Sequence, residues 1–316
     1  MHEAAGFGGV TSAGYSSRNQ PLPCPSMLSL ISSEKSFSDR WVGSRFLNLH
    51  KAHRRRMAIA EQCASLRRLM AASWSSSLPA VRESLAASGY AVVPNFLDPE
   101  AFTALVNEVE AVVADVEARR PISNDGVEGF GRKISFEGGV DRFDGDTLNR
   151  FIDIDAASMP HAAAFARNGD VSALTRTVVG VPHPAWKTQI YVTAHGAEDR
   201  HPDIQKLLHR DTFFSAMKFW YFLRPVRDED GPFAYVPGSH RLDDRRLAWE
   251  QSIADDIFAN GGRHPNASGS FRIDEADLPR LGLPSPVSLT CEANTLVIAN
   301  VLGFHRRGHA ADARRR

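Results

Sequence analysis

Residues 207–223 read LLHRDTFFSAMKFWYFL, and this stretch decides the fold class of the 316-residue chain. Within it, 207–211 and 216–223 have the short length, the apolar content and the turn-bounded spacing that predict β-strands. The other predicted strands downstream of the first hundred residues are 187–193, 233–236 and 295–301. Short strands separated by turn signals are typical of a β-sandwich or jelly roll.

Helical patterns flank these strands. Asp98-Pro99-Glu100 supplies an N-cap residue, a proline at the first helical position and an acid in the first turn, which predicts a helix after Asp98. Residues 78–87 and 159–168 are predicted helices, and 90–94 is a short predicted strand. The fold class is therefore mainly β with flanking helices, an α+β arrangement. The stretches 121–145 and 242–284 are predicted as variable loops, the first with edge strands.

The composition excludes several classes of protein. A chain with 43% apolar and 23% charged residues buries a core, and its 37 basic residues equal its 37 acidic ones, which argues against a nucleic-acid-coating protein. The longest apolar runs, 162–166 and 219–223, are far shorter than the roughly 20 residues of a membrane span. The 3 cysteines form no C-x-x-C pair, which favours a reducing compartment, the cytoplasm. Nothing indicates an oligomeric state.

The N-terminal quarter differs from the rest of the chain. Residues 1–38 are rich in Gly, Ser and Pro and predict a flexible low-complexity segment. Residues 39–77 combine apolar and arginine-rich positions and predict a basic amphipathic helical extension, which either packs outside the main domain or serves as a targeting segment. The compact domain is predicted to span 78–316.

The residues suited to chemistry lie in the second half of the chain. In an extended strand, residues i and i+2 point the same way, so His209 and Asp211 can share one target. His305 follows the predicted strand 295–301. Two imidazoles and one carboxylate on one face of a metal form the facial triad of non-haem Fe(II) oxygenases, which leaves positions open for cosubstrate and oxygen.

A second H-x-D sequence, His201-Pro202-Asp203, competes with this pair. It lies in a polar stretch, and its proline would disrupt the pairing of a strand, whereas His209 has apolar strand neighbours. The sequence therefore favours His209 and Asp211.

Three longer segments resemble a known family. Residues 207–211, 218–223 and 231–240, the last of which ends in Val236-Pro237-Gly238-Ser239-His240, resemble the phytanoyl-CoA dioxygenase family of Fe(II)- and 2-oxoglutarate-dependent oxygenases. Residues 90–100 and 294–305 resemble its opening strand and helix and its distal metal segment. The resemblance covers about 78–316. It implies a double-stranded β-helix, a cupin-like jelly roll, which would lack its last strand in a chain that ends at Arg316.

The resemblance also implies the chemistry. Fe(II) would be bound by His209, Asp211 and His305, with 2-oxoglutarate and O₂ at the open positions. The products would be succinate, CO₂ and a small organic or acyl molecule hydroxylated at a C–H bond. Relatives that halogenate carry a small residue at the position of Asp211, so halogenation is disfavoured.

The family places an arginine that binds the far carboxylate of 2-oxoglutarate about eleven positions past the distal histidine, which is Arg316 here. Relatives often have a small hydroxyl residue where this chain has Arg307. The competing interpretation of Arg306-Arg307 and of 314–316 is a solvated basic tail.

Three more residues are candidates for the cosubstrate site. Gln189 and Thr193 share one face of the predicted strand 187–193, so they are expected to meet the cosubstrate or substrate if that face points inward. Trp220 occupies a position where the family often has an aromatic residue near the cosubstrate. Core or surface roles are the alternatives for all three.

Two other classes of function remain open at this stage. One is a metal-binding jelly roll without turnover, or a degenerate or truncated family member. The other is a zinc hydrolase that uses the same ligands. The expected partners are a small-molecule substrate and O₂, with no nucleic acid and no membrane span.

Overall fold

The computed structural model describes residues 5–12, 34–39, 42–44, 51–71, 78–122, 131–196, 201–260 and 264–311. Its strands are β1 (Ala5–Ser12), β2 (Tyr90–Val93), β3 (Arg132–Phe136), β4 (Gly139–Asp144), β5 (Thr147–Asp153), β6 (Thr188–Ala194), β7 (His209–Arg210), β8 (Ala216–Phe222), β9 (Phe233–Tyr235), β10 (Phe271–Arg272), β11 (Val287–Ser288), β12 (Thr295–Asn300) and β13 (His305–Arg307). Its α-helices are α3 (Ala52–Ala71), α4 (Pro79–Ser88), α5 (Pro99–Arg119), α6 (Pro160–Ala166), α7 (Gly169–Val179) and α8 (Asp244–Asn260). Short 3₁₀ helices are η1 (Ala185–Lys187), η2 (Ile204–Lys206) and η4 (Glu275–Leu281).

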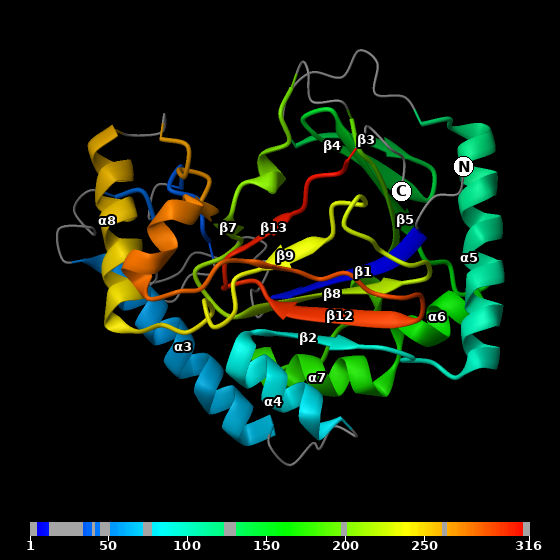
Figure 1. The fold of residues 1–316 in the computed structure, drawn as a ribbon, viewed down its shortest axis with the longest axis horizontal. Helices are drawn as coiled ribbons and strands as arrows, with labels where there is room; N and C mark the ends of the chain where they lie inside the picture. The colour runs from blue at the N-terminus through cyan, green and yellow to red at the C-terminus, as the bar shows by residue number, and fades with distance from the viewer. Residues whose placement is uncertain are drawn as a thin grey trace, which may run out of the picture.

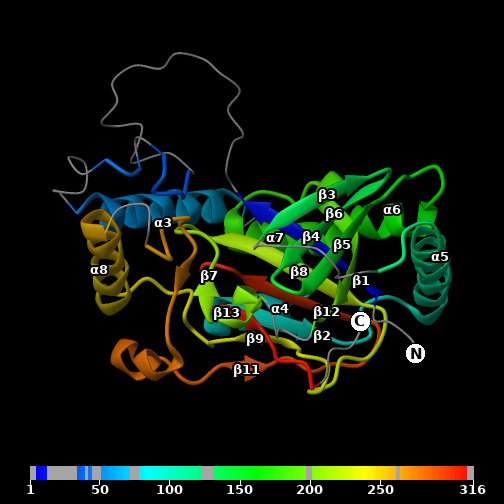
Figure 2. The same ribbon diagram turned by 90° about the horizontal axis from the view of Figure 1, so that it is seen from above.

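Two antiparallel sheets carry the fold (Figures 1 and 2). The larger sheet has the strand order β2-β12-β8-β1-β6-β5-β4-β3, and the smaller one has the order β10-β7-β13-β9-β11. The α+β class predicted from the sequence is confirmed.

The larger sheet buries one face against helices. Buried Thr188, Ile190, Val192 and Ala194 alternate along β6 with less buried residues, as expected of a strand with two different faces. Ile190 and Val192 belong to the main core cluster, together with residues of α5, α6 and α7. The other face of β6 carries Gln189, Tyr191 and Thr193, which are of intermediate burial.

The helix predicted after Asp98 is α5. The Asp98 side chain accepts hydrogen bonds from the backbone N–H groups of Glu100 and Ala101, so it caps the first turn. Upstream, α4 ends at Gly89, whose φ of 85° is accessible to glycine at little cost. The chain then turns directly into β2, which pairs with β12.

Strand β1 differs from the prediction for the N-terminal segment. Residues 5–12, expected to be flexible, lie between β6 and β8 and pair antiparallel with both. Neither β6 nor β8 is therefore an edge strand of the larger sheet. The sequence AGFGGVTS is rich in glycine and has little strand propensity, so its pattern gave no indication of this pairing.

Helices α3 and α8 lie in segments for which the sequence predicted a helical extension and a loop, respectively. Helix α3 lies within the predicted basic extension, and it contacts α7 through Arg68, whose Nη1 donates to the carbonyl of Val178 at 3.0 Å. Helix α8 lies within 242–284, which was predicted as a loop. Its buried residues include Arg246 and Glu250, while Trp249, Ile253 and Ile257 recur at helical spacing and pack in a core cluster.

No helix among the described residues is long and apolar enough to cross a membrane.

Candidate metal centre

The two histidines of the predicted triad come from neighbouring strands of the smaller sheet. His209 begins β7 and His305 begins β13, and the two residues are direct partners in the antiparallel ladder. Paired residues of such a ladder point to the same side, and here the ring centroids are 4.6 Å apart. Asp211 follows β7, where its backbone N–H donates to the carbonyl of Val301 at 3.0 Å.

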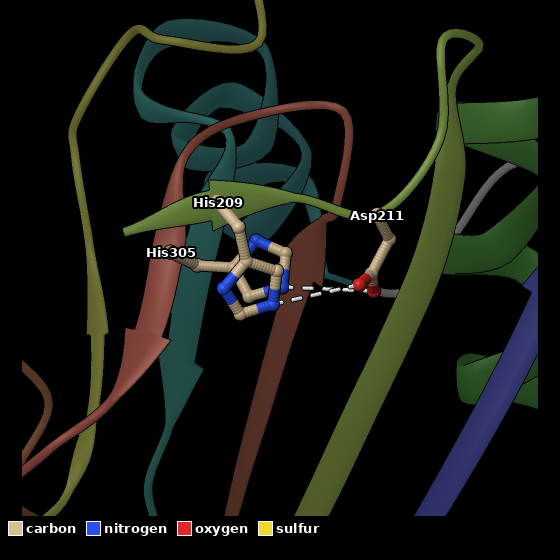
Figure 3. A group of neighbouring side chains, drawn as sticks. All are labelled: His209, Asp211 and His305. Atoms are coloured by element: carbon tan, nitrogen blue, oxygen red, sulfur yellow. Dashed lines mark ion pairs between the residues drawn. The ribbon is translucent and has the colours of Figure 1, made fainter. Parts of the chain in front are cut away.

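Figure 3 shows the three side chains directed toward one point. Nε2 of His209 lies 3.6 Å from Oδ1 of Asp211, and Nε2 of His305 lies 3.6 Å from Oδ2. The three potential ligand atoms all lie within 4.8 Å of one another, and no other group of three His, Cys, Asp or Glu residues in the described ranges has this geometry. This arrangement fits one metal ion bound on one face, with its other positions open.

Backbone contacts fix the orientation of both imidazoles. Nδ1 of His209 lies 2.7 Å from the carbonyl of Leu207, and Nδ1 of His305 lies 2.9 Å from the carbonyl of Gly303. A carbonyl only accepts, so each Nδ1 must carry the proton, and the lone pair of each ring is on Nε2. Both Nε2 atoms therefore present lone pairs to the same point, as metal-binding histidines do.

The charge states of the triad also suit a metal. Burial, and next the neighbouring His305, lower the pKa of His209 to about 3, so this ring is neutral near pH 7. Burial opposes ionisation of Asp211, but Lys218 and His305 outweigh it and hold the pKa of Asp211 well below its usual range. Metal ligands must be deprotonated to bind, and these two already are.

Lys218 is a member of the site that the sequence analysis missed. Its Nζ lies 2.5 Å from Oδ2 of Asp211, and it comes from β8 in the larger sheet. The pair shows that side chains of the two sheets meet at the triad. The sequence did contain a signal for Lys218, which is the only charged residue in the largely apolar run FSAMKFWYFL. A charged residue at a buried strand position rarely lacks a partner, so this lysine could have been predicted to form an ion pair.

The turn at 236–240 positions the second histidine. The buried Ser239 hydroxyl accepts the N–H of Phe304 at 2.8 Å and donates to the carbonyl of Val236 at 2.6 Å. Tyr235 donates its hydroxyl to the carbonyl of Asn300 at 2.7 Å. Both contacts hold the chain that leads into His305, which gives the motif a structural role.

Ser239→Ala is expected to weaken metal binding roughly tenfold, because a contact that orients a ligand is lost. It should also lower the free energy of unfolding by about 1–3 kcal/mol, since the buried N–H of Phe304 is left without its acceptor. Metal titration and chemical denaturation measure the two effects. The exposed Ser252→Ala on α8 is the control and should change neither; an unaltered metal affinity in Ser239→Ala would contradict this role.

The competing H-x-D pair lies outside the one cluster of three potential metal ligands found among the described residues. Asp203 accepts the N–H of Gln205 at 2.9 Å, which caps η2, and its other oxygen forms an ion pair with Arg307. Its carboxylate is therefore occupied within the protein. The preference for His209 and Asp211 agrees with this geometry.

Arg307 is not part of a solvated tail, which corrects that interpretation for this residue. Besides Asp203, its guanidinium contacts Asn149 Oδ1 at 2.7 Å and the Tyr191 hydroxyl at 3.3 Å. Asp144 lies 3.5 Å away. Arg307 thus joins β13 of the smaller sheet to β5 and β6 of the larger one.

The residues predicted at the cosubstrate site lie in different surroundings. Trp220 packs on Phe233 at 4.4 Å between ring centroids, and Phe233 lies 5.5 Å from the ring of His305. Thr193 pairs with Asn149, on the face directed toward Arg307. The Gln189 amide donates to Asp153 at 2.6 Å in an exposed position. Arg316, like 314–315, lies outside the described residues.

A buried ionic cluster links β7 to helix α8. Glu250 of α8 accepts hydrogen bonds from Arg210 at 2.9 and 2.6 Å and from Arg246 at 3.0 Å, and it lies 3.0 Å from Nε2 of His53. Arg210 stands between the two triad residues of β7 and carries its charge away from them. All four side chains are nearly inaccessible to solvent.

Solved structures with related shapes share little sequence with this chain. The epimerase SnoN in complex with Fe3+, alpha ketoglutarate and nogalamycin RO is 16% identical with a TM-score of 0.45, and the match covers 76% of this chain and 80% of SnoN. AviO1 from Streptomyces viridochromogenes Tue57 is 17% identical with a TM-score of 0.42, covering 76% and 92%. HygX from Streptomyces hygroscopicus with nickel and 2-oxoglutarate bound is 15% identical with a TM-score of 0.38, covering 75% and 83%. TM-scores of this size do not establish a common fold.

The comparison with curated proteins gives no match. The model of the family described as phytanoyl-CoA dioxygenase (PhyH) matches residues 85–276, which is more than half of the chain and includes His209 and Asp211. His305 lies beyond the match, and the structure brings it to the other two. The chain belongs to the phytanoyl-CoA dioxygenase family of Fe(II)- and 2-oxoglutarate-dependent oxygenases.

Proposed function

We propose that this protein is an Fe(II)- and 2-oxoglutarate-dependent dioxygenase that hydroxylates a C–H bond of a small organic or acyl substrate. The observation that carries the proposal is the convergence of two oriented imidazoles and one ionised carboxylate within 4.8 Å. Family membership supports the same chemistry. Asp211 keeps a carboxylate where halogenating relatives have a small residue, which supports oxygen transfer over halogenation.

His209, Asp211 and His305 would hold Fe(II) through the two Nε2 atoms and a carboxylate oxygen. Iron so bound supplies the activation of O₂ and the coupled conversion of 2-oxoglutarate to succinate and CO₂. The protein's contribution is to orient the ligands, to keep water out and to hold the substrate carbon in place. The low exposure of both histidines, 3% and 4%, is consistent with a site shielded from solvent.

Among the residues proposed to bind 2-oxoglutarate, Trp220 has the best structural support because its ring packs on Phe233, whose own ring contacts that of His305. Thr193 is supported by its place on the same face of β6 as Tyr191, which contacts Arg307, whereas Gln189 is already bonded to Asp153. Arg316 remains our proposal for the far carboxylate, because the planar guanidinium matches a carboxylate with two parallel hydrogen bonds.

The two antiparallel sheets, whose side chains meet at Lys218 and at Arg307, support a jelly roll of the double-stranded β-helix type. The expected partners are a small-molecule substrate and O₂, and the proposed compartment is the cytoplasm. The proposed domain division remains 1–38, 39–77 and 78–316.

Anaerobic protein mixed with Fe(II) and 2-oxoglutarate should develop a weak visible charge-transfer band, and exposure to air should then yield succinate. Omission of iron or of 2-oxoglutarate is the control and should give neither signal. A band without succinate would favour a metal-binding protein without turnover. Activity with zinc that needs no 2-oxoglutarate would favour a hydrolase instead.

The type of oxidation is tested once a substrate is found by screening small organic and acyl compounds. Hydroxylation adds one oxygen atom to the product, as mass spectrometry would show. Epimerisation leaves the mass unchanged, and oxidative ring closure removes two hydrogens, so either result would overturn the hydroxylase proposal while leaving the iron centre intact.

A further inference from the structure

A short piece of the N-terminal region packs against the strands of the metal centre. The backbone N–H of Phe37 donates to the carbonyl of Ala267 at 2.8 Å, and the Phe37 ring stacks on Phe271 of β10 at 5.7 Å between centroids. The start of α3 holds the piece in place, because Arg56 donates to the carbonyl of Glu34. In Figure 2 this blue segment, residues 34–39, lies beside α3 and α8.

The packing at this place leaves no room between the two backbones. A Cβ added to Gly269, which has a φ of +86°, would lie 2.0 Å from the carbonyl oxygen of Lys35. Glycine is the residue that permits both this conformation and this approach. The carbonyl of Gly269 in turn accepts a hydrogen bond from Arg210, the residue between His209 and Asp211. Residues 34–39 therefore pack directly against Gly269, which is hydrogen-bonded to Arg210 of the strand that carries His209.

Lys35 connects the segment to the triad itself. Its Nζ donates to the backbone carbonyl of Asp211 at 2.8 Å and to the hydroxyl of Ser270 at 3.0 Å. The Ser270 hydroxyl lies 3.4 Å from the same carbonyl. On the other side of the residue, the N–H of Asp211 is bonded to Val301 at 3.0 Å. Since Asp211 lies just outside β7, these contacts replace the strand ladder in fixing its backbone.

We propose that residues 34–39 are an integral part of the metal centre and that Lys35 is a positioning residue that holds Asp211 in its ligand geometry. A segment expected to be a flexible extension thereby determines where the only carboxylate of the triad lies. The inference rests on the proposed metal centre but not on turnover. Partners that orient a ligand typically contribute a factor of roughly 10–100 to metal affinity.

Titration of the full-length protein with Co(II), followed by its visible absorption, tests the proposal. Lys35→Met should raise the dissociation constant of Co(II) roughly tenfold or more and change the shape of its visible bands, because the Asp211 carboxylate is no longer held in place. Lys35→Arg, which keeps a donor, should recover part of the affinity. The control is Lys133→Met, an exposed lysine on β3, which should bind Co(II) like the unmodified protein.

Ser270→Ala provides a second, milder variant should Lys35→Met not fold. Ser270→Ala should also raise the dissociation constant of Co(II). In the double variant the two effects should not add, because Lys35, Ser270 and the Asp211 carbonyl form one hydrogen-bonded group that either substitution disrupts. An affinity and a spectrum unchanged in Lys35→Met, or in Ser270→Ala where only that variant folds, would overturn the proposal. So would a loss of affinity in Lys35→Met that Lys35→Arg does not recover at all. Failure of the unmodified protein to bind Co(II) would instead overturn the metal centre itself.

Discussion

Asp211→Ala should abolish Fe(II)-dependent formation of succinate from 2-oxoglutarate and reduce metal affinity by more than the roughly 10–100-fold that loss of an orienting contact costs. Asp211 is the only carboxylate near Nε2 of His209 and His305 within the described residues. Its loss leaves two imidazoles and the positive charge of Lys218, which repels a cation. Anaerobic Fe(II) titration and a succinate assay measure the two effects.

Asp203→Asn is the matched control, since Asp203 is the carboxylate of the competing H-x-D sequence. Asparagine is preferable to alanine here because its side-chain oxygen still accepts a hydrogen bond from Arg307. Metal affinity and succinate formation should stay close to those of the unmodified protein, because Asp203 lies outside the triad. Retained activity in Asp211→Ala together with lost activity in Asp203→Asn would mean that the metal lies at the other pair.

Glu250→Ala should lower the free energy of unfolding by about 3–5 kcal/mol, because it leaves buried cations without their counter-charge. Glu250 is 0% exposed and forms ion pairs with both Arg210 and Arg246. Because Arg210 lies between His209 and Asp211, metal affinity should fall as well. Urea denaturation of the metal-free protein measures the first effect separately.

Asp244→Ala is the comparison on the same helix. Asp244 pairs with Arg54 at the surface and is 91% exposed, so its loss should cost less than about 1 kcal/mol. Equal effects of the two substitutions would contradict the assigned role of Glu250.

The contribution of Glu250 to the free energy of unfolding should also decrease as the pH is lowered. Burial opposes ionisation, but Arg210 and His53 outweigh it, so the pKa of Glu250 in the folded protein is well below that of an exposed glutamate. A lowered folded pKa gives stability that is complete above the unfolded pKa of about 4.3 and is lost as the pH falls toward the folded value. The difference in free energy of unfolding between the unmodified protein and Glu250→Ala should therefore be constant near neutral pH and become smaller in acid.

Sequence patterns predicted the elements whose residues follow a local rule. Helix α5 begins at a capping aspartate followed by proline, and β6 alternates between two environments, so both could be read directly. Helix α8 could not be read as directly, because charged Arg246 and Glu250 are buried beside its apolar row of Trp249, Ile253 and Ile257. Strand β1 could not either, because its pairing depends on two distant neighbours and its own residues are mostly glycine and small side chains.

The same division applies to the site. The spacing of His209 and Asp211, together with the family resemblance, predicted the triad. Lys218, Arg307 and Lys35 owe their roles to long-range contacts, with Asp211 or with Asp203, that no local spacing encodes. Of the three, only Lys218 carries a sequence signal, a charged residue within a predicted apolar strand, and that signal identifies the residue without its partner.

The central claim is that one metal ion binds between residues 209, 211 and 305. Anomalous X-ray scattering at the iron edge, from crystals loaded with Fe(II) under nitrogen, tests it directly. We predict one peak within bonding distance of Nε2 of His209, Nε2 of His305 and a carboxylate oxygen of Asp211. A peak beside Asp203, or no peak between the two imidazoles, would contradict the account.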